Sequence, residues 1–478
     1  MRTLHQTLML FAIIIIEGYI VLSTELLAIR QTIPYVGSGT DTVSIIIAAV
    51  LMPLAFGYQY GGRFKPRMFF GHYITIRAKL ILNILISATI LLIGMSHHFV
   101  LWFFTLLPSL GIDDRLLQTS IYSILFLVIP VYLLGQTVPL VSNFFSKEKL
   151  SKITGKILFF STVGSFLGAI LSTLVLMAVI GVHHTVSLNF VLLAVLVLML
   201  SKKRFSKSVL YIFVVALLAL LFNSDGVMNY YHIKKNNQYA TIVAGTLKNG
   251  NRELYINGNN SSRYNDAGKK HDYIEFAERL AISPIMNSIP AKDILVIGAG
   301  GFTFGHQDKT NSYTYVDIDK DLLEVAERYI LQEPIGDNKI FVPKPARAFL
   351  NSTTQKYDVI YLDAYLGGAS IPEMLVTQEF FKQVKSHLKD GAILISNMIL
   401  SPHFNNQFTR NIDNTLRSVF PHVSRQVINE NYNMWSDSER LMANVAYIYR
   451  HEESYDKGSV YTDNKNTVFY DKPKSMKP

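Results

Sequence analysis

The first 222 residues of this chain consist almost entirely of long apolar segments joined by short polar connections, and this pattern constrains the fold more than any other feature. A helix needs about 20 apolar residues to cross the hydrocarbon core of a bilayer. The sequence therefore predicts a helical membrane domain over residues 1–222. Its seven predicted spans are 8–29, 43–61, 77–95, 119–140, 157–181, 184–200 and 208–222.

The first apolar segment is too long for a cleaved signal peptide and contains Glu17 and Glu25, so we expect it to remain as a span. A carboxylate inside a bundle faces either a polar cavity or neighbouring helices that bond it, and we favour the second interpretation. Gly164, Gly168 and Ser172 recur at four-residue spacing, which predicts close helix packing.

Charge is distributed unevenly along the chain. There are 45 Lys and Arg against 35 Asp and Glu, which gives a formal net charge of +10. Residues 1–222 carry 16 basic and 6 acidic residues, whereas residues 223–478 carry 29 of each. A nucleic-acid partner is not expected. Binding nucleic acid would need a basic face on the soluble half, where basic and acidic residues are equal in number.

The basic residues of the first half gather in three loops, and such clusters mark cytoplasmic loops. The clusters are Arg63, Lys65, Arg67, Arg77 and Lys79; Lys147, Lys149, Lys152 and Lys156; and Lys202, Lys203, Arg204 and Lys207. The N-terminus is then cytoplasmic, and seven spans place the soluble half on the other side. The side of the membrane on which the soluble half lies stays undecided, because segment 209–222 is short for a span and segment 99–112 is equally ambiguous.

The second half is typical of a nucleotide-binding α/β domain. An apolar strand, 294–297, leads into Gly298, Gly300 and Gly301, and a second strand ends at Asp317, about 20 residues on. Glycines let the backbone approach a ligand, and the carboxylate can accept hydrogen bonds from ribose hydroxyls. Strands and helices alternate from residue 294 to residue 397, which predicts a mostly parallel sheet with helices on both faces.

A smaller region precedes this domain. Runs 239–244 and 252–256 predict a β-hairpin through the Lys248–Asn251 turn, followed by a polar loop and a helix over 272–286. The predicted domains are therefore the membrane domain 1–222, the hairpin and connecting helix 223–290, and the Rossmann-like domain 291–478.

The soluble half resembles the spermidine synthases (polyamine aminopropyltransferases), and the whole chain resembles their bacterial membrane-fused branch. The motifs that carry the resemblance are Leu254–Gly258, Leu295–Gly300, Val316–Asp319, Ala346–Leu350, Tyr357–Ala364, Ile371–Thr377 and Leu388–Gly391, with Glu25–Arg30, Gly135–Leu140, Gly164–Gly168 and Tyr461–Asn464. The resemblance implies a fold like that of the S-adenosylmethionine-dependent methyltransferases and a location in the bacterial inner membrane.

The resemblance also implies the chemistry and the site. An amine would attack the aminopropyl carbon of decarboxylated S-adenosylmethionine, a co-substrate, with no tightly bound cofactor. Asp363 matches the family's general base. The residues that the resemblance implies for nucleoside binding are Gly298, Gly300, Gly301, Asp317 and Ala346. The expected partners are a small-molecule amine, a thionucleoside and the lipid bilayer, and a homodimer is an option.

Several polar positions of the family pattern are replaced here. Acidic residues of the family are replaced by Gly301, Pro345 and Leu366, a Tyr-Gln or Tyr-His pair by Phe276 and Ala277, and a glutamine by Ser261. Burying two ammonium groups without carboxylates would cost several kcal/mol each. We therefore expect weak activity towards a diamine such as putrescine.

Two other functions stay open: a membrane-tethered methyltransferase, and a non-catalytic sensor or carrier that binds a nucleoside or polyamine. His271 is an alternative base, although an exposed histidine without a role is the simpler interpretation. No cysteine occurs, and no histidines pair at i, i+4, so no metal site is expected. Adjacent histidines such as His183 and His184 are not expected to face one site together.

Overall fold

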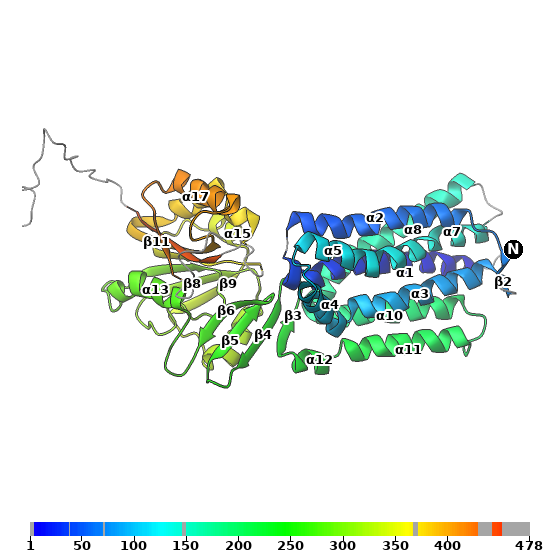
Figure 1. Cartoon of the computed structure of the whole chain (residues 1–478), viewed down its shortest axis with the longest axis horizontal. Coiled ribbons are helices and arrows are strands. Elements are labelled where there is room, and N and C mark those ends of the chain that lie inside the picture. Colours follow the sequence, from blue (N-terminus) through cyan, green and yellow to red (C-terminus); the bar gives the residue numbers. More distant parts are fainter. Residues whose placement is uncertain are drawn as a thin grey trace, which may run out of the picture.

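The computed structural model describes residues 4–37, 39–69, 72–145, 150–366, 371–428 and 442–451. A helical half and an α/β half lie end to end along the long axis of the molecule (Figure 1). The motif Tyr461–Asn464 lies outside the described residues.

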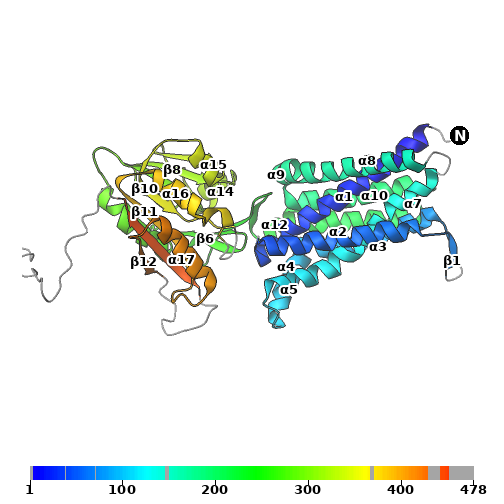
Figure 2. The ribbon, with the colours of Figure 1, turned by 90° about the horizontal axis from the view of Figure 1, so that it is seen from above.

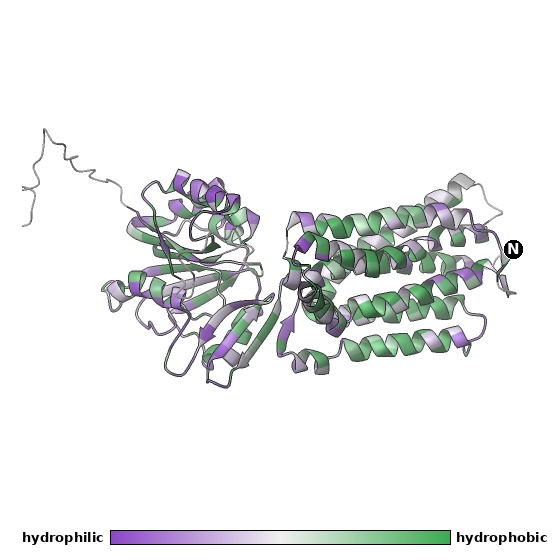
Figure 3. Ribbon diagram, viewed as in Figure 1, coloured by the Kyte–Doolittle hydropathy of each residue, from purple (hydrophilic) through white to green (hydrophobic). Residues whose placement is uncertain are grey.

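The helical half contains seven helices that are long and apolar enough to cross a membrane, as the sequence predicted. These helices consist mostly of hydrophobic residues (Figure 3), and many of their large apolar side chains are exposed. Several spans are built from more than one element, with π-helical turns at η1 and η3. The elements are α1 (Leu4–Val36), α2 (Thr40–Gly62), α3 (Ile76–Met95), α4 (His97–Ser109), α5 (Arg115–Ser123), η1 (Ile124–Val128), α6 (Ile129–Gly135), α7 (Thr137–Ser142), η2 (Asn143–Phe145), α8 (Leu150–Ile170), η3 (Leu171–Leu176), α9 (Met177–Val179), α10 (Gly181–Leu200), α11 (Lys207–Phe222) and α12 (Asp225–Tyr230).

Helices α1 and α8 pack closely, which confirms the prediction from the small residues. A Cβ at Gly164 or Gly168 would collide with the backbone of α1, so only glycine allows this approach. Ser172 donates to Ser23 Oγ at 2.7 Å. Glu17 is buried between the helices, and neither carboxylate oxygen has a hydrogen-bond partner among the described residues. The expected bonds from neighbouring helices are therefore not seen for Glu17.

The two ends of the bundle differ. The N-terminus, the hairpin of β1 (Arg67–Phe69) with β2 (His72–Ile74), and the α10–α11 connection lie at the end away from the α/β half (Figures 1 and 2). Two of the three basic clusters belong to these loops. Segment 99–112 forms the short helix α4, which is not among the seven candidate spans.

A four-stranded antiparallel sheet follows the bundle, in the order β3 (Ile233–Asn236), β4 (Thr241–Thr246), β5 (Arg252–Ile256), β6 (Asn259–Tyr264). The predicted hairpin is confirmed as β4 and β5. The predicted polar loop after it is wrong, because residues 259–264 form β6. Among the described strands it pairs with β5 alone, at the edge of the sheet, and an edge strand need not show an apolar run.

The large sheet has the strand order β12-β13-β11-β10-β7-β8-β9, with β7 to β11 parallel and β13 antiparallel to both its neighbours. This arrangement confirms the Rossmann-like, methyltransferase-like fold. Its strands are β7 (Asp293–Ile297), β8 (Ser312–Asp317), β9 (Lys339–Pro343), β10 (Tyr357–Leu362), β11 (Leu388–Leu400), β12 (Ser424–Val427) and β13 (Ala443–Arg450).

Helices cover the faces of the large sheet through two apolar cores. They are α13 (Asp272–Ala281), η4 (Ser283–Ile285), α14 (Leu322–Val325), η5 (Ala326–Leu331), α15 (Ala346–Asn351), η6 (Glu373–Leu375), α16 (Gln378–Ser386) and α17 (Gln407–Val419). The strand order reverses between β7 and β10, and ligands of open α/β sheets bind at such a reversal, beyond the carboxyl ends of the strands.

One side chain of α1 joins the two halves. Arg30 is buried, its Nε donates to the carbonyl oxygen of Asn237 at 2.8 Å, and an Nη donates to Thr241 Oγ1 at 3.2 Å. The Nδ2 of Asn237 in turn donates to Asp319 Oδ1 at 2.9 Å, just beyond the end of β8.

Candidate active site

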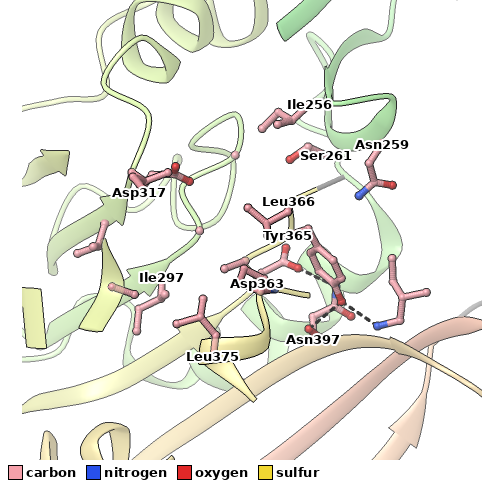
Figure 4. A pocket seen from close by; sticks show the side chains of 18 of the residues that line it. Ile256, Asn259, Ser261, Ile297, Asp317, Asp363, Tyr365, Leu366, Leu375 and Asn397 are labelled. Carbon is pink, nitrogen blue, oxygen red and sulfur yellow. Dashed lines mark hydrogen bonds between the residues drawn. The ribbon is translucent and has the colours of Figure 1, made fainter. Parts of the chain in front are cut away.

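A cavity of about 390 Å³ lies at the carboxyl ends of β7, β8 and β10. Strand β6 and the first turn of α13 form its opposite wall. The sheet order places the ends of β8, β7, β10 and β11 side by side, so residues from four distant parts of the sequence meet here. In Figure 4, Asp363 lies between Asp317 and Asn397.

The glycine loop after β7 forms the floor of this cavity. Gly298 has φ +91°, and a Cβ there would collide with the carbonyl oxygen of Asp363. Gly300 has φ +51°, and a Cβ there would lie 2.9 Å from Ser262 Oγ. Both positions therefore need glycine, for conformation and for space, and both line the cavity.

Asp317 is the last residue of β8 and lines the cavity beside this loop. Its Oδ2 accepts from the N–H of Ala299 and its Oδ1 from the N–H of Asp319, both at 3.1 Å. Burial raises the pKa of Asp317 to about 6, although these two hydrogen bonds oppose the rise. Within the described part of the chain only backbone N–H groups bind this carboxylate, so it can accept further hydrogen bonds from a ligand.

Asp363 follows β10 directly, and its N–H donates to Ile297 O at 2.8 Å. Its Oδ1 accepts from Asn397 Nδ2 at 2.9 Å, and its Oδ2 accepts from Tyr361 Oη at 3.2 Å. Burial raises the pKa of Asp363 to about 6. The carboxylate is therefore oriented by two neutral donors, is ionised at neutral pH, and has a higher proton affinity than an exposed aspartate.

Aromatic side chains form the wall around Asp363. Tyr365 accepts from the N–H of Ile399 at 2.7 Å and donates to the carbonyl oxygen of Asn397 at 3.2 Å. On the other side, Tyr273 donates to Ser261 O at 3.1 Å. Because the hydroxyls of these phenol rings are engaged in hydrogen bonds, the rings present mainly apolar surface around Asp363.

His271 is half-buried and lines the cavity, so the expectation of an exposed histidine is wrong. It stacks on Tyr273, and its Nε2 lies 3.0 Å from Asn260 Oδ1. Burial, assisted by the nearby cation of Arg263, lowers the pKa of His271 to about 4. The ring is therefore neutral at physiological pH.

The structure brings together most of the predicted site residues. Gly298, Gly300, Asp317, Ala346 and Asp363 all line the cavity. Gly301 is not among the lining residues. Its N–H donates to Ser262 Oγ at 2.8 Å, and a Cβ would lie 2.8 Å from Ser262 Cβ. Strand β6 thus fills the space that an acidic side chain at position 301 would need.

The other replaced positions divide into two groups. Ser261, Pro345 and Leu366 line the cavity, and the absence of acids at Pro345 and Leu366 makes it less acidic there. Phe276 and Ala277 are buried residues of α13 and do not line it.

Sequence reasoning missed several polar groups of the cavity, namely Asn260, Asn397 and Asn444. Asn397 is the most informative, because it fixes Asp363 while its own Oδ1 is buried and has no hydrogen-bond partner among the described residues. Its signal in the sequence was a Ser-Asn pair inside an otherwise apolar strand, at the carboxyl end where ligands bind.

Comparisons with known proteins find relatives of the α/β half. Residues 275–430 match the family described as the Spermine/spermidine synthase domain. The probable polyamine aminopropyl transferase of Bifidobacterium longum is 28% identical over 205 residues, which cover 42% of this chain and 42% of that protein. The polyamine aminopropyltransferase of Saccharolobus islandicus is 30% identical over 198 residues, or 39% of this chain and 62% of that protein.

Among solved structures, a probable spermidine synthase from Corynebacterium glutamicum aligns with a TM-score of 0.38 and 19% identity, covering 46% of this chain and 81% of that one. The chain spans between 42% and 62% of the length of these curated relatives.

Proposed function

We propose that this spermidine synthase-like protein is an aminopropyltransferase that uses decarboxylated S-adenosylmethionine and an amine. One observation carries the proposal. Within the matched domain, a single cavity contains an oriented carboxylate, Asp363, beside a glycine loop and a second carboxylate, Asp317, suited to a nucleoside.

The reaction needs a positioned acceptor more than an activated leaving group. The nitrogen lone pair of the amine attacks the aminopropyl carbon, and the bond from that carbon to sulfur breaks. Its electron pair goes to sulfur, which leaves neutral methylthioadenosine. The new C–N bond makes an ammonium group, whose proton passes to Asp363. A base of this kind contributes ~10²–10⁴-fold to a rate.

The chain's own residues suit the two halves of this reaction. Gly298 and Gly300 let the nucleoside approach the end of β7, and Asp317 would accept from its ribose hydroxyls. Asp363 is held by Asn397 and Tyr361, so its free lone pairs face the cavity.

Apart from its reacting end, the acceptor amine should carry little charge. Beyond Asp363 the cavity is lined by apolar residues, Leu366, Met374, Ile399 and Ile428, and Asp272 is the other carboxylate on the α13 side. A second ammonium group buried against the apolar wall would lack a counter-ion. A monoamine, or an amine with an apolar tail, is therefore the favoured acceptor class.

The other two functions are less favoured. A non-catalytic sensor or carrier does not account for a carboxylate held by two donors at the expected position of a base. A methyltransferase shares the sheet, but the match is to the synthase domain.

We also infer that the seven apolar helices cross a bacterial inner membrane with the N-terminus in the cytoplasm. The support is that the N-terminus and the loops after α2 and α10, which are rich in Lys and Arg, lie at the end opposite the α/β half (Figure 1). The soluble half would then face away from the cytoplasm. A homodimer stays a prediction, which the mass of the detergent-solubilised protein would test.

The proposed activity can be tested on the full chain in detergent micelles. Decarboxylated S-adenosylmethionine is supplied with a panel of monoamines, diamines and polyamines, and methylthioadenosine and the aminopropylated amine are measured by mass spectrometry. Intact S-adenosylmethionine is the matched control. Equal amounts of both products support the proposal, whereas transfer of a methyl group, or no product with any amine, would overturn it.

A further inference from the structure

Two histidines and one aspartate converge at the junction between the helical and α/β halves. His183 and His184 lie in the first turn of α10, and Asp225 is the first residue of α12. The Nε2 atoms of both rings lie 3.1 Å from Asp225 Oδ1. One atom of each residue lies within 4.8 Å of the other two.

The expectation that adjacent histidines do not face one site is wrong for this pair. The chain reverses at Gly181, where φ is +84°, so α10 begins with its first turn facing α12. Ser224 caps α12 by accepting from the N–H of Val227, which leaves Asp225 directed towards α10. The two rings then approach the same carboxylate oxygen, with their centroids 4.2 Å apart.

These separations match a metal site. Ligand atoms at about 2.0–2.1 Å from a tetrahedral Zn²⁺ lie about 3.3 Å from one another. The two distances of 3.1 Å are close to that value, so small side-chain rotations would admit an ion. Two imidazole nitrogens and one carboxylate suit Zn²⁺ and similar transition metals, and disfavour Mg²⁺ and Ca²⁺, which prefer oxygen ligands.

A second observation points the same way. A cavity of about 470 Å³ adjoins the cluster and is lined by His183 and Asp225 together with Asn229, Asn237 and Asp321. It shares no lining residue with the cavity that contains Asp363. It provides room for water at the coordination positions that the protein leaves open.

We propose that His183, His184 and Asp225 bind one divalent transition-metal ion of the Zn²⁺ type, with water from this cavity completing the coordination. The ion joins α10 to α12, the last helix before β3, and so fixes the α/β half to the helical half. Binding to the folded form alone would also raise the stability of that junction. The proposal does not depend on the transferase activity.

The test uses the full, tag-free chain in detergent micelles after removal of metals with a chelator. Zn²⁺ is titrated in competition with a chromophoric chelator. The parent should bind one ion, and Asp225→Asn and His184→Gln should each weaken binding at least about tenfold. Glu333→Gln is the matched control, because Glu333 accepts from a single histidine, His306, at 2.8 Å, and its loss should leave Zn²⁺ affinity unchanged.

Two further measurements separate ligand loss from misfolding. Asp225→His restores a metal-binding side chain and should retain binding of one Zn²⁺. Co²⁺ added to the parent should give the visible absorption bands of a four- or five-coordinate ion, and Asp225→Asn should abolish them. Absence of Zn²⁺ binding by the parent, or equal affinity in the parent, Asp225→Asn and His184→Gln, would overturn the proposal.

Discussion

Replacement of Asp363 by asparagine should remove activity and stabilise the protein at the same time. The asparagine has nearly the same shape, and its Oδ1 can still accept from Asn397 Nδ2. Tyr361 Oη can turn to accept from the new amide. The variant therefore keeps both hydrogen bonds and loses only the negative charge and the proton-accepting function.

The size of the stabilisation follows from the raised pKa of Asp363. Burial raises this pKa from 3.8 to about 6, which corresponds to roughly 3 kcal/mol at 1.36 kcal/mol per pH unit. The folded state holds the proton more tightly than the unfolded chain does. Stability is therefore lost as the pH rises from about 3.8 to about 6, and the full cost remains at higher pH. Asp363→Asn removes that cost.

The assay compares thermal unfolding and transferase rate for the parent and Asp363→Asn at pH 4 and pH 8. At pH 8 the variant should melt several degrees higher, since a domain of this size gains roughly 2–4 °C per kcal/mol. At pH 4 the two should melt together. Turnover should fall by ~10²–10⁴-fold at pH 8, and parental activity should rise with pH through about 6 as Asp363 ionises.

Asp358, at the other end of β10, provides the matched control. Burial alone would raise the pKa of Asp358, but Lys389 Nζ at 2.8 Å and the N–H of Asp293 outweigh burial and lower it. A lowered pKa stabilises the folded state at high pH, and that stability is lost as the pH falls. Asp358→Asn should thus melt lower than the parent at pH 8. If Asp363→Asn is destabilised in the same way, or keeps its activity, the reasoning is refuted.

Three other predictions concern the rest of the cavity and the topology. Asp317→Ala should weaken binding of methylthioadenosine by ~1.5–3 kcal/mol for each lost charge-assisted hydrogen bond; unchanged affinity in calorimetry would contradict the nucleoside assignment. Gly301→Asp should fail to restore a diamine site and should lower the melting temperature, because its side chain would collide with β6. Leu366→Asp, which places an acid in the cavity, should raise the rate with putrescine. The opposite ranking of the two variants would count against the described arrangement of β6 and the cavity. A reporter active only outside the cytoplasm should be active when fused after Pro478 and silent when inserted at Lys203. Silence at both sites would show that an even number of spans lies between the two positions, and activity at Lys203 with silence at Pro478 would show the inverted orientation.

The sequence predicted features that depend on neighbouring residues in the chain. The apolar spans, the β4–β5 hairpin and the strand–glycine–strand pattern up to Asp317 each follow from local periodicity and turn chemistry, and the structure confirms these elements. Asp363 was identified through the family resemblance, and the structure places it directly after β10. Local reasoning failed at residues 259–264, because an edge strand need not show an apolar pattern.

Only the tertiary structure decided which distant residues meet. Gly301 lies against Ser262, Asn397 holds Asp363, and Asp225 receives His183 and His184, yet the partners are separated by 34 to 42 residues. Side-chain hydrogen bonds act over about 3 Å, so their partners depend on how strands are ordered and where helices begin, which local patterns do not specify. The sequence by itself therefore determined the class of fold and the two carboxylates of the site, Asp317 and Asp363. Packing determined the surroundings of these carboxylates, the lack of space for an acid at Gly301, and the approach of His183 and His184 to Asp225.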